Sequence, residues 1–288
     1  MRAHHYLLVS LLSISPYVTT QAQKIPELGL VESIEQDSLA YAAGFHLLGE
    51  TVGKMLSPTL SEEQFQENLQ KIKKARTKIY LCNVLFPGSL KIAGPEVDEA
   101  KVLAHVDQVF ARAKKANIPV IVLGSGGSRR LPDGYSNELA KEKFIPLCRQ
   151  MALLAKKHNV TIAIESLNST ETNFLNTVQE TAEIVKKVNH PNFRLNADIY
   201  HMLKENEPPQ HIIDAGKIIV HVEIAEKEKR TVPGVVGEDF RPYLQALKKI
   251  KYQGPIVVEA KVNDAAKEIP LAYQYLTQQL KEVYGTNK

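Results

Sequence analysis

The chain has 288 residues, of which 44% are hydrophobic and 24% are charged, a composition typical of a globular protein with ample material for a core. The net charge of +4 is small, and lysines and arginines are mixed with glutamates along the expected helices. Composition and charge therefore give no indication of a nucleic-acid partner. No Pro/Gly/Ser-rich linker divides the interior, so we expect one domain over residues 23–288.

The first 22 residues have the layout of a secretory signal peptide. Arg2 precedes an apolar run from Tyr6 to Ile14, and Thr20 and Ala22 place small residues at the −3 and −1 positions of a cleavage site. The run is too short to span a bilayer comfortably, although an uncleaved membrane anchor is the alternative. We expect cleavage after Ala22 and a mature protein that is periplasmic or secreted, with no membrane association.

The next part of the chain alternates short apolar runs, which predict strands, with segments of helical spacing. We expect strands at residues 28–32, 46–50, 78–86 and 118–123, and helices at residues 37–43, 61–75 and 97–116. Near-continuous apolar runs are typical of strands buried on both faces. The stretch 124–130 is rich in glycine and serine. It is interpreted as a flexible surface loop, or as a loop that wraps an anion with Arg129 or Arg130.

The same alternation continues to the C-terminus. We expect strands at residues 160–165, 193–198, 218–223 and 256–259, and helices at residues 137–158, 170–188, 209–215, 239–250 and 264–284. Eight strand–helix units in about 265 mature residues predict a (β/α)₈ TIM barrel, which typically needs about 250. An open doubly wound sheet is the alternative, but no Gly-x-Gly-x-x-Gly follows the first expected strand.

Active sites of such barrels lie at the C-terminal ends of the strands. Glu165, Asp198 and Glu259 end three of the last four expected strands, and His221 lies on the other. Carboxylates with one imidazole suit a divalent ion that keeps open positions for substrate oxygens. Burying these acids together without a cation would be costly, and independent caps or surface acids are the alternative interpretation.

Several motifs accompany these residues, and they are clearest in the C-terminal half. They are Ile164-Glu-Ser-Leu-Asn168 with Glu171, Asp198-Ile-Tyr-His201, His221-Val-Glu223, Arg230-Thr-Val-Pro-Gly234 and Tyr252-Gln-Gly-Pro-Ile-Val-Val-Glu259. Through them the chain resembles the xylose isomerase-like barrel superfamily of sugar isomerases and epimerases, which includes ketose 3-epimerases and hydroxypyruvate isomerases. The resemblance implies one divalent metal ion, Mn²⁺ first, with Mg²⁺, Co²⁺ and Zn²⁺ as alternatives. The implied metal ligands are Glu165, Asp198, His221 and Glu259.

The same resemblance implies Glu165 and Glu259 as the catalytic acid–base pair. It also implies that three residues bind substrate oxygens: Glu171, His201 and Arg230. The segment that leads to Arg230 is longer than the equivalent loop of the epimerases, so Lys227 and Lys229 are alternatives to this arginine. The chain has no Trp, and the sugar-stacking candidates are Phe86, Phe174 and Tyr200.

This chemistry leads to a functional expectation. A cation at the carbonyl and hydroxyl oxygens of a sugar stabilises the enediolate that forms when the adjacent carbon loses its proton. Two carboxylates on opposite faces can remove that proton and return it. We therefore expect an isomerase or epimerase of an unphosphorylated sugar or sugar derivative. Two alternatives stay open: a lyase- or hydrolase-type eliminase of 3-keto-glycosides that uses the same metal and glutamates, and a non-catalytic sugar-binding barrel.

The remaining expectations concern thiols and assembly. Cys82 falls in an expected strand and Cys148 in an expected helix. Buried free thiols are the default, and a disulfide between them is the alternative in an exported protein. A small-molecule carbohydrate is the expected partner, and the sequence leaves monomer and homo-oligomer open.

Overall fold

The computed structural model describes Met1 and residues 23–285, so the expected signal peptide and its cleavage site lie outside the described residues. Eight parallel strands close into a barrel in chain order, which confirms the predicted TIM barrel. The strands are β1 (Leu28–Val31), β2 (Leu47–Thr51), β3 (Lys78–Asn83), β4 (Val120–Leu123), β5 (Thr161–Glu165), β6 (Phe193–Asp198), β7 (Ile219–Ile224) and β8 (Ile256–Val258).

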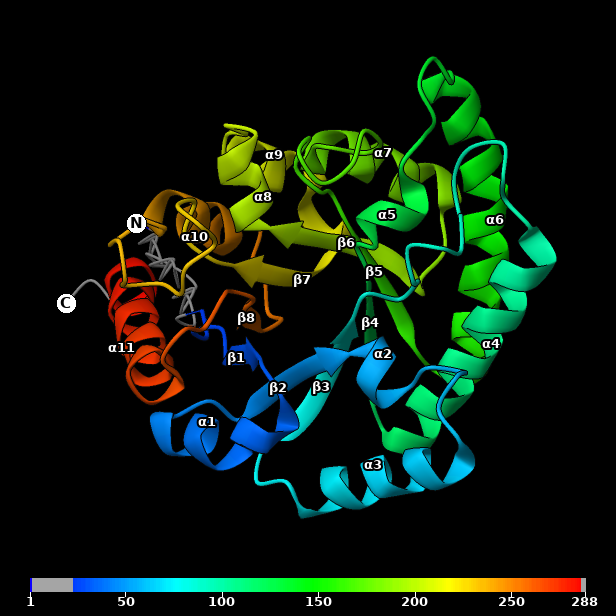
Figure 1. The fold of residues 1–288 in the computed structure, drawn as a ribbon. Coiled ribbons are helices and arrows are strands. Elements are labelled where there is room, and N and C mark those ends of the chain that lie inside the picture. The colour runs from blue at the N-terminus through cyan, green and yellow to red at the C-terminus, as the bar shows by residue number, and fades with distance from the viewer. Residues whose placement is uncertain (2–22, 286–288) are drawn as a thin grey trace.

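The helices surround the strands, and their colours follow chain order round the ring (Figure 1). The longer helices form the outer wall, whereas the short helices α2, α5 and α8 lie nearer the centre of the view. The α-helices are α1 (Asp37–Ala43), α2 (Val52–Met55), α3 (Glu62–Lys74), α4 (Glu99–Ala116), α5 (Gly126–Arg129), α6 (Asn137–His158), α7 (Val178–Val188), α8 (Ile199–Lys204), α9 (Gln210–Ala215), α10 (Arg241–Lys249) and α11 (Ala265–Tyr284).

Side-chain caps explain where most of the long helices begin. Ser61 and Gln64 form a reciprocal capping box at the start of α3. The hydroxyl of Ser136 accepts the N–H of Leu139 at the start of α6. At the other end of α6, Asn159 adopts the left-handed conformation with φ of 59°, which asparagine tolerates better than most residues. The chain therefore encodes these helix limits locally.

Three expectations differ from the structure. The strand expected over residues 78–86 ends at Asn83, and the next residue, Val84, has a left-handed φ of 58°. The helix expected from residue 170 begins only at Val178, because Thr177 caps α7 by accepting the N–H of Glu180. The prediction for residues 170–177 was therefore wrong, and these residues form part of the loop after β5. The glycine-rich stretch after β4 contains the short helix α5, in which the Arg129 side chain is fully buried.

The apolar core has two parts. The larger part lies between the strands and the surrounding helices. The smaller part, which we call the apolar layer, fills the barrel interior with Leu81, Val120, Val122, Ala163 and Val257. Gly49 of β2 makes room for it, because a Cβ atom there would lie 2.8 Å from Leu81 Cδ1. Both cysteines are buried and unpaired.

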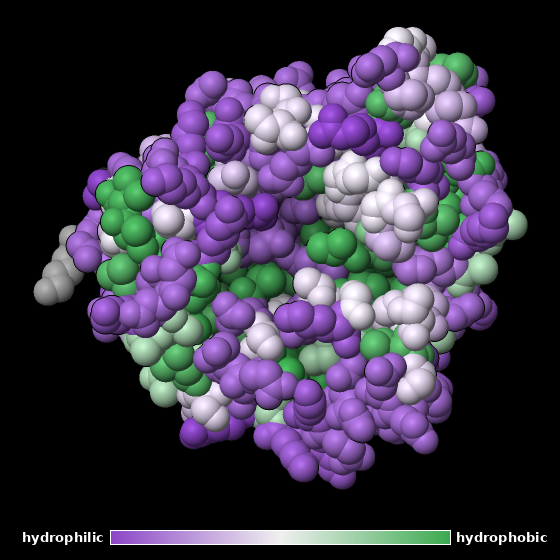
Figure 2. Space-filling view, viewed as in Figure 1, coloured by the Kyte–Doolittle hydropathy of each residue, from purple (hydrophilic) through white to green (hydrophobic). Residues whose placement is uncertain are grey.

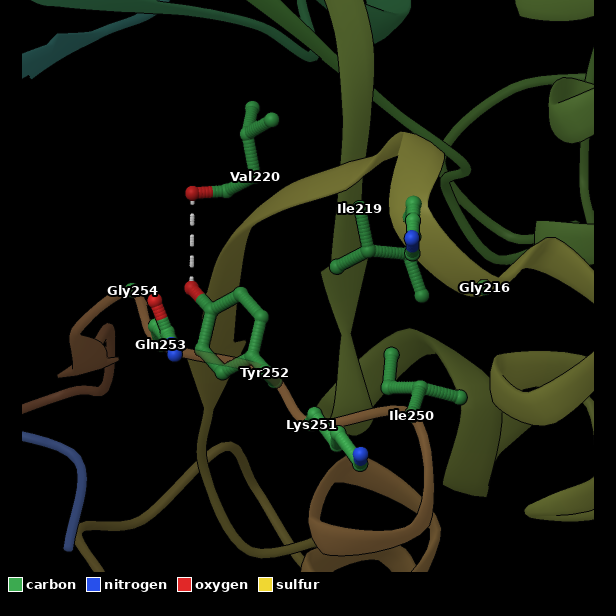
Figure 3. Close-up of a pocket in the computed structure, with 9 residues that line it drawn as sticks. Gly216, Ile219, Val220, Ile250, Lys251, Tyr252, Gln253 and Gly254 are labelled. Atoms are coloured by element: carbon green, nitrogen blue, oxygen red, sulfur yellow. Dashed lines mark hydrogen bonds between the residues drawn. The ribbon is translucent and has the colours of Figure 1, made fainter. Parts of the chain in front are cut away.

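The N-terminal end of the barrel holds a pocket between the segments that precede β7 and β8 (Figure 3). The hydroxyl of Tyr252 donates to backbone carbonyl oxygens of Pro255 at 2.8 Å and Val220 at 3.4 Å, which ties these segments together. No acidic side chain lines this pocket among the described residues. None of the described helices has the length and apolar character needed to cross a membrane.

Candidate active site

Four carboxylates converge at the C-terminal end of the barrel. One oxygen from each side chain lies within 4.8 Å of the others, and the four residues are Glu165, Asp198, Glu223 and Glu259. They come from four consecutive strands: two are the last residues of β5 and β6, Glu223 lies near the end of β7, and Glu259 directly follows β8. We call them the acidic cluster. Figure 2 shows a hollow at the centre of this face, lined by both hydrophilic and hydrophobic residues.

His221, an expected metal ligand, is not one of the four convergent residues. It lies two residues before Glu223 on β7, so both side chains point to the same side of the strand. The ring is fully buried one level deeper in the barrel, 6.0 Å from the ring of Tyr80, and its Nε2 lies 3.4 Å from Glu223 Oε1. Burial lowers the pKa of His221 to about 4. The neutral ring therefore lies beneath the cluster, and neither of its nitrogens has a hydrogen-bond partner among the described residues.

Two buried asparagines, which the sequence interpretation did not select, join the acidic cluster. The Asn196 amide donates to Glu165 at 3.1 Å and also to Glu223. The Asn83 amide donates to Glu223 at 3.1 Å and also to Glu259. Three carboxylates are thus linked through two amides, which fix their orientations. The signal for both residues was a polar side chain within an otherwise apolar strand.

Gly124, directly after β4, leaves room for Glu165. A Cβ atom at this position would lie 1.8 Å from Glu165 Oε1, and under 3.0 Å something must shift. Any other residue would therefore displace the carboxylate. The same loop continues into α5, where the Arg129 guanidinium has no hydrogen-bond partner among the described residues. Arg130 donates to the backbone carbonyl of Glu171 at 2.8 Å, so it ties this loop to the loop after β5.

His201, one turn after Asp198, is held as a hydrogen-bond donor. Its Nδ1 accepts the backbone N–H of Asn168 at 3.1 Å, which assigns the proton of a neutral ring to Nε2. Burial lowers the pKa of His201 to about 3, so the ring is neutral at pH 7. Nε2 lies 3.4 Å from Asp198 Oδ2. A ring nitrogen of His201 lies within 4.8 Å of carboxylate oxygens of Glu165 and Asp198, so these three residues form a second group that could hold a metal ion. With its proton on Nε2, the ring is suited to donate to a sugar oxygen.

The basic residues of the loop after β7 have different surroundings. Arg230 reaches the acidic cluster, where it pairs with Glu259 and lies 3.4 Å from Asp198 and 3.8 Å from Glu171. Lys227 donates instead to Asn206 at 2.8 Å. The Lys229 side chain is 82% exposed. Of the three alternatives, only Arg230 contacts the acidic cluster.

Other expected residues lie round the same mouth. Glu171 accepts from the Asn168 amide at 3.0 Å. The Tyr200 ring packs under Arg230, whose Cζ lies 4.6 Å from the ring centroid. Phe86 and Phe174 are buried in the outer core, which makes them packing residues rather than stacking platforms.

The electrostatics of the acidic cluster favour a bound cation. Burial raises the pKa of Glu165 well above 4.5, and the neighbouring Glu223 and Glu259 carboxylates raise it further. Burial likewise raises the pKa of Glu223 and of Asp198, and in the case of Asp198 the Arg230 charge opposes the shift. Three buried acids and the partly exposed Glu259 carry more negative charge than the one guanidinium beside Asp198 and Glu259 can compensate. An all-oxygen donor set of this kind fits Mn²⁺ or Mg²⁺.

The chain is similar to a family of barrel proteins and to several epimerases. The family model described as xylose isomerase-like TIM barrel matches residues 38–279. The L-ribulose 3-epimerase of Methylomonas sp. (strain DH-1) is 34% identical over 128 residues, 44% of each chain. The D-psicose 3-epimerase of Ruminiclostridium cellulolyticum is 31% identical over 174 residues, 58% of each chain. The chain thus matches these curated relatives over about half of their length.

Solved structures agree on the architecture. A structure of an L-ribulose 3-epimerase superposes with a TM-score of 0.77 at 18% identity, and it covers 90% of this chain and 95% of that chain. At this identity the likeness concerns the fold. The family model covers most of the chain, including all four residues of the acidic cluster. The chain therefore belongs to the xylose isomerase-like TIM barrel family.

Proposed function

We propose that the protein is a divalent-metal-dependent sugar isomerase or epimerase that acts through an enediolate. The observation that carries the proposal is the convergence of four carboxylates, three of them buried and Glu259 partly exposed, at the C-terminal mouth of the barrel. The curated relatives are named as epimerases of the ketoses L-ribulose and D-psicose, and this supports a ketose as the substrate class.

The metal ligands that the geometry supports are Glu165, Asp198, Glu223 and Glu259. In this proposal Glu223 takes the place that the sequence interpretation gave to His221, because Glu223 reaches the cluster and the imidazole lies beneath it. Such an ion, when bound, stabilises negative charge that develops on the carbonyl and hydroxyl oxygens of the sugar. Oxygen donors alone favour Mn²⁺ or Mg²⁺ over Zn²⁺.

The acid–base pair is Glu165 and Glu259, which come from β5 and β8 on different sides of the barrel. One carboxylate removes the proton from the carbon next to the carbonyl, and the other returns a proton to the opposite face. Neutral His201 and cationic Arg230 donate to substrate oxygens, and Glu171 accepts from substrate hydroxyls.

The expected signal peptide gives the cellular setting of this proposal. Export after cleavage at Ala22 would place the enzyme in the periplasm or outside the cell, with no membrane anchor. Phosphorylated sugars are scarce there, so the substrate is an unphosphorylated ketose or a related sugar derivative. A carbohydrate is then the small-molecule partner, and monomer and homo-oligomer are both compatible with the barrel.

The decisive experiment follows a proton. The protein loaded with Mn²⁺ is incubated with L-ribulose or D-psicose in D₂O, and the sugars are analysed by NMR. We expect a new epimer or isomer with deuterium at the reacting carbon, and Glu165→Gln should remove both. Absence of exchange with each ketose would contradict the proposal. Release of an aglycone from a 3-keto-glycoside would support the eliminase, and sugar binding without exchange would support the non-catalytic barrel.

A further inference from the structure

Arg230 occupies a position between two carboxylates of the acidic cluster. Its Nη2 pairs with Glu259 and lies 3.4 Å from Asp198 Oδ2, and its Nε donates to the backbone carbonyl of Glu259 at 3.1 Å. The side chain is 20% exposed, and its guanidinium lies over the ring of Tyr200. These contacts use the oxygens of two side chains that are also assigned to the divalent ion.

The loop that carries Arg230 is built around the carboxylate of Glu226, which is fully buried. Its Oε1 accepts the backbone N–H groups of Gly234 and Gly237, each at 2.8 Å. Its Oε2 accepts the N–H of Val236 at 2.7 Å and the hydroxyl of Thr231 at 2.8 Å. A buried carboxylate with this many donors is satisfied without a cation, so Glu226 determines the shape of the loop.

The backbone of Arg230 is also fixed from the side of β8. The carbonyl of Arg230 accepts the N–H of Lys261 at 2.8 Å, and Thr231 pairs with Lys261 in a parallel bridge. Lys229 and Arg230 have φ of 54° and 57°, a left-handed conformation that is uncommon for residues other than glycine. Such a conformation persists only where surrounding contacts impose it. The loop therefore holds the guanidinium over the cluster.

We propose that Arg230 is an internal counter-ion of the metal-free acidic cluster, which an incoming divalent ion must displace from Asp198 and Glu259, and that Glu226 is the residue that positions it. This inference rests on the proposed metal-dependent function. A guanidinium and a divalent ion beside the same oxygens repel each other, so binding of one weakens binding of the other. Once displaced, the guanidinium remains at the mouth and donates to substrate oxygens.

The test is calorimetric titration of the metal-free full chain with Mn²⁺ at pH 8, with thermal unfolding measured with and without Mn²⁺. The variants are Arg230→Gln, Glu226→Gln and the double variant. Lys229→Gln is the matched control, because it removes the same charge from the adjacent, exposed position. We expect Arg230→Gln to bind Mn²⁺ at least tenfold more tightly than the wild type. It should also unfold at a lower temperature without metal and show a larger metal-induced rise.

The remaining variants distinguish a loss of the Arg230 position from a general destabilisation of the loop. Glu226→Gln should shift Mn²⁺ affinity in the same direction as Arg230→Gln but less, and the double variant should match Arg230→Gln, since Glu226 acts through the guanidinium. Lys229→Gln should bind Mn²⁺ within twofold of the wild type. Equal or weaker Mn²⁺ binding by Arg230→Gln, beside a wild type that binds, would overturn this inference alone. A wild type that binds no Mn²⁺ would overturn the proposed metal site as well.

Discussion

The barrel interior has two levels of opposite character. The apolar layer in its middle consists of aliphatic side chains that need no partner. The acidic cluster above it holds four carboxylates, three of them buried, and the raised pKa values of Glu165 and Glu223 show that negative charge is disfavoured there. Burial of the apolar layer stabilises the fold, whereas burial of the cluster destabilises it until a cation binds. The barrel thus holds the side chains that stabilise the fold at one level and the proposed metal ligands at the next.

A single strand shows the boundary between the two levels. β7 places His221 beside Tyr80 at the level of the apolar layer and Glu223 in the acidic cluster. Both side chains are fully buried and point the same way. Depth along the strand therefore decides which of the two reaches the acidic cluster.

Removal of the acid–base pair should have the largest effect. Glu165→Gln and Glu259→Gln should each lower turnover of the ketose by about 10²–10⁴-fold, because an amide cannot accept the proton. Glu228→Gln, on the exposed part of the loop after β7, is the control and should retain wild-type turnover. Wild-type turnover by Glu165→Gln would exclude this residue from proton transfer.

A substitution in the apolar layer should act on stability instead. Leu81→Ala should lower the free energy of unfolding by about 2–5 kcal/mol, since it leaves a cavity in a fully buried site. Glu223→Gln should raise the stability of the metal-free protein, because it removes a buried charge. Chemical denaturation in EDTA measures both. Destabilisation of the metal-free protein by Glu223→Gln would contradict the assigned difference between the two levels.

The two neighbours on β7 should differ in metal binding. Glu223→Gln should weaken Mn²⁺ binding by on the order of 100-fold, whereas His221→Gln should cost on the order of tenfold or less, as expected for a residue that supports a ligand. Titration calorimetry of both variants gives the two affinities. The reverse order would restore His221 as the ligand that the sequence indicated.

In the metal-free protein, the acidic cluster should make the free energy of unfolding depend on pH. The folded-state pKa of Glu223 lies well above 4.5, so the native state holds this proton more tightly than the unfolded state. Stability from this group is therefore present at low pH and is lost as pH rises above 4.5 toward the folded pKa. The stability advantage of Glu223→Gln over the wild type in EDTA should increase between pH 5 and 8. A constant difference would show that the pKa is not raised.

Much of the site can be predicted from the rule that active-site residues of a barrel lie at the C-terminal ends of its strands. Glu165, Asp198 and Glu259 can be identified from the sequence because they stand where parallel strands end, and the closed barrel brings them together. The choice between His221 and Glu223 could not be made this way, since residues two apart face the same side of a strand. Their depth depends on a register shift between β6 and β7 near Asn196. Such irregularities arise from tertiary packing and leave no local pattern.

The fold shows the same division between local and non-local information. Caps such as Ser61 and Ser136 begin α3 and α6 at the expected places. The sequence places the start of α7 too early, because apolar residues also precede Thr177. The Thr177 side chain caps the helix, which therefore begins only at Val178. The role of Gly124 depends on a carboxylate from the next strand, 41 positions later in the chain. A contact of this kind is visible only in three dimensions.

The most direct test is a crystal structure of the protein grown with Mn²⁺, with anomalous diffraction used to locate the ion. We expect one ion at the mouth of the barrel, about 2.0–2.6 Å from oxygens of four side chains, as is usual for hard divalent cations. Those side chains are Glu165, Asp198, Glu223 and Glu259. An ion bound elsewhere, or an ion bound through His221 with Glu223 turned away, would contradict it.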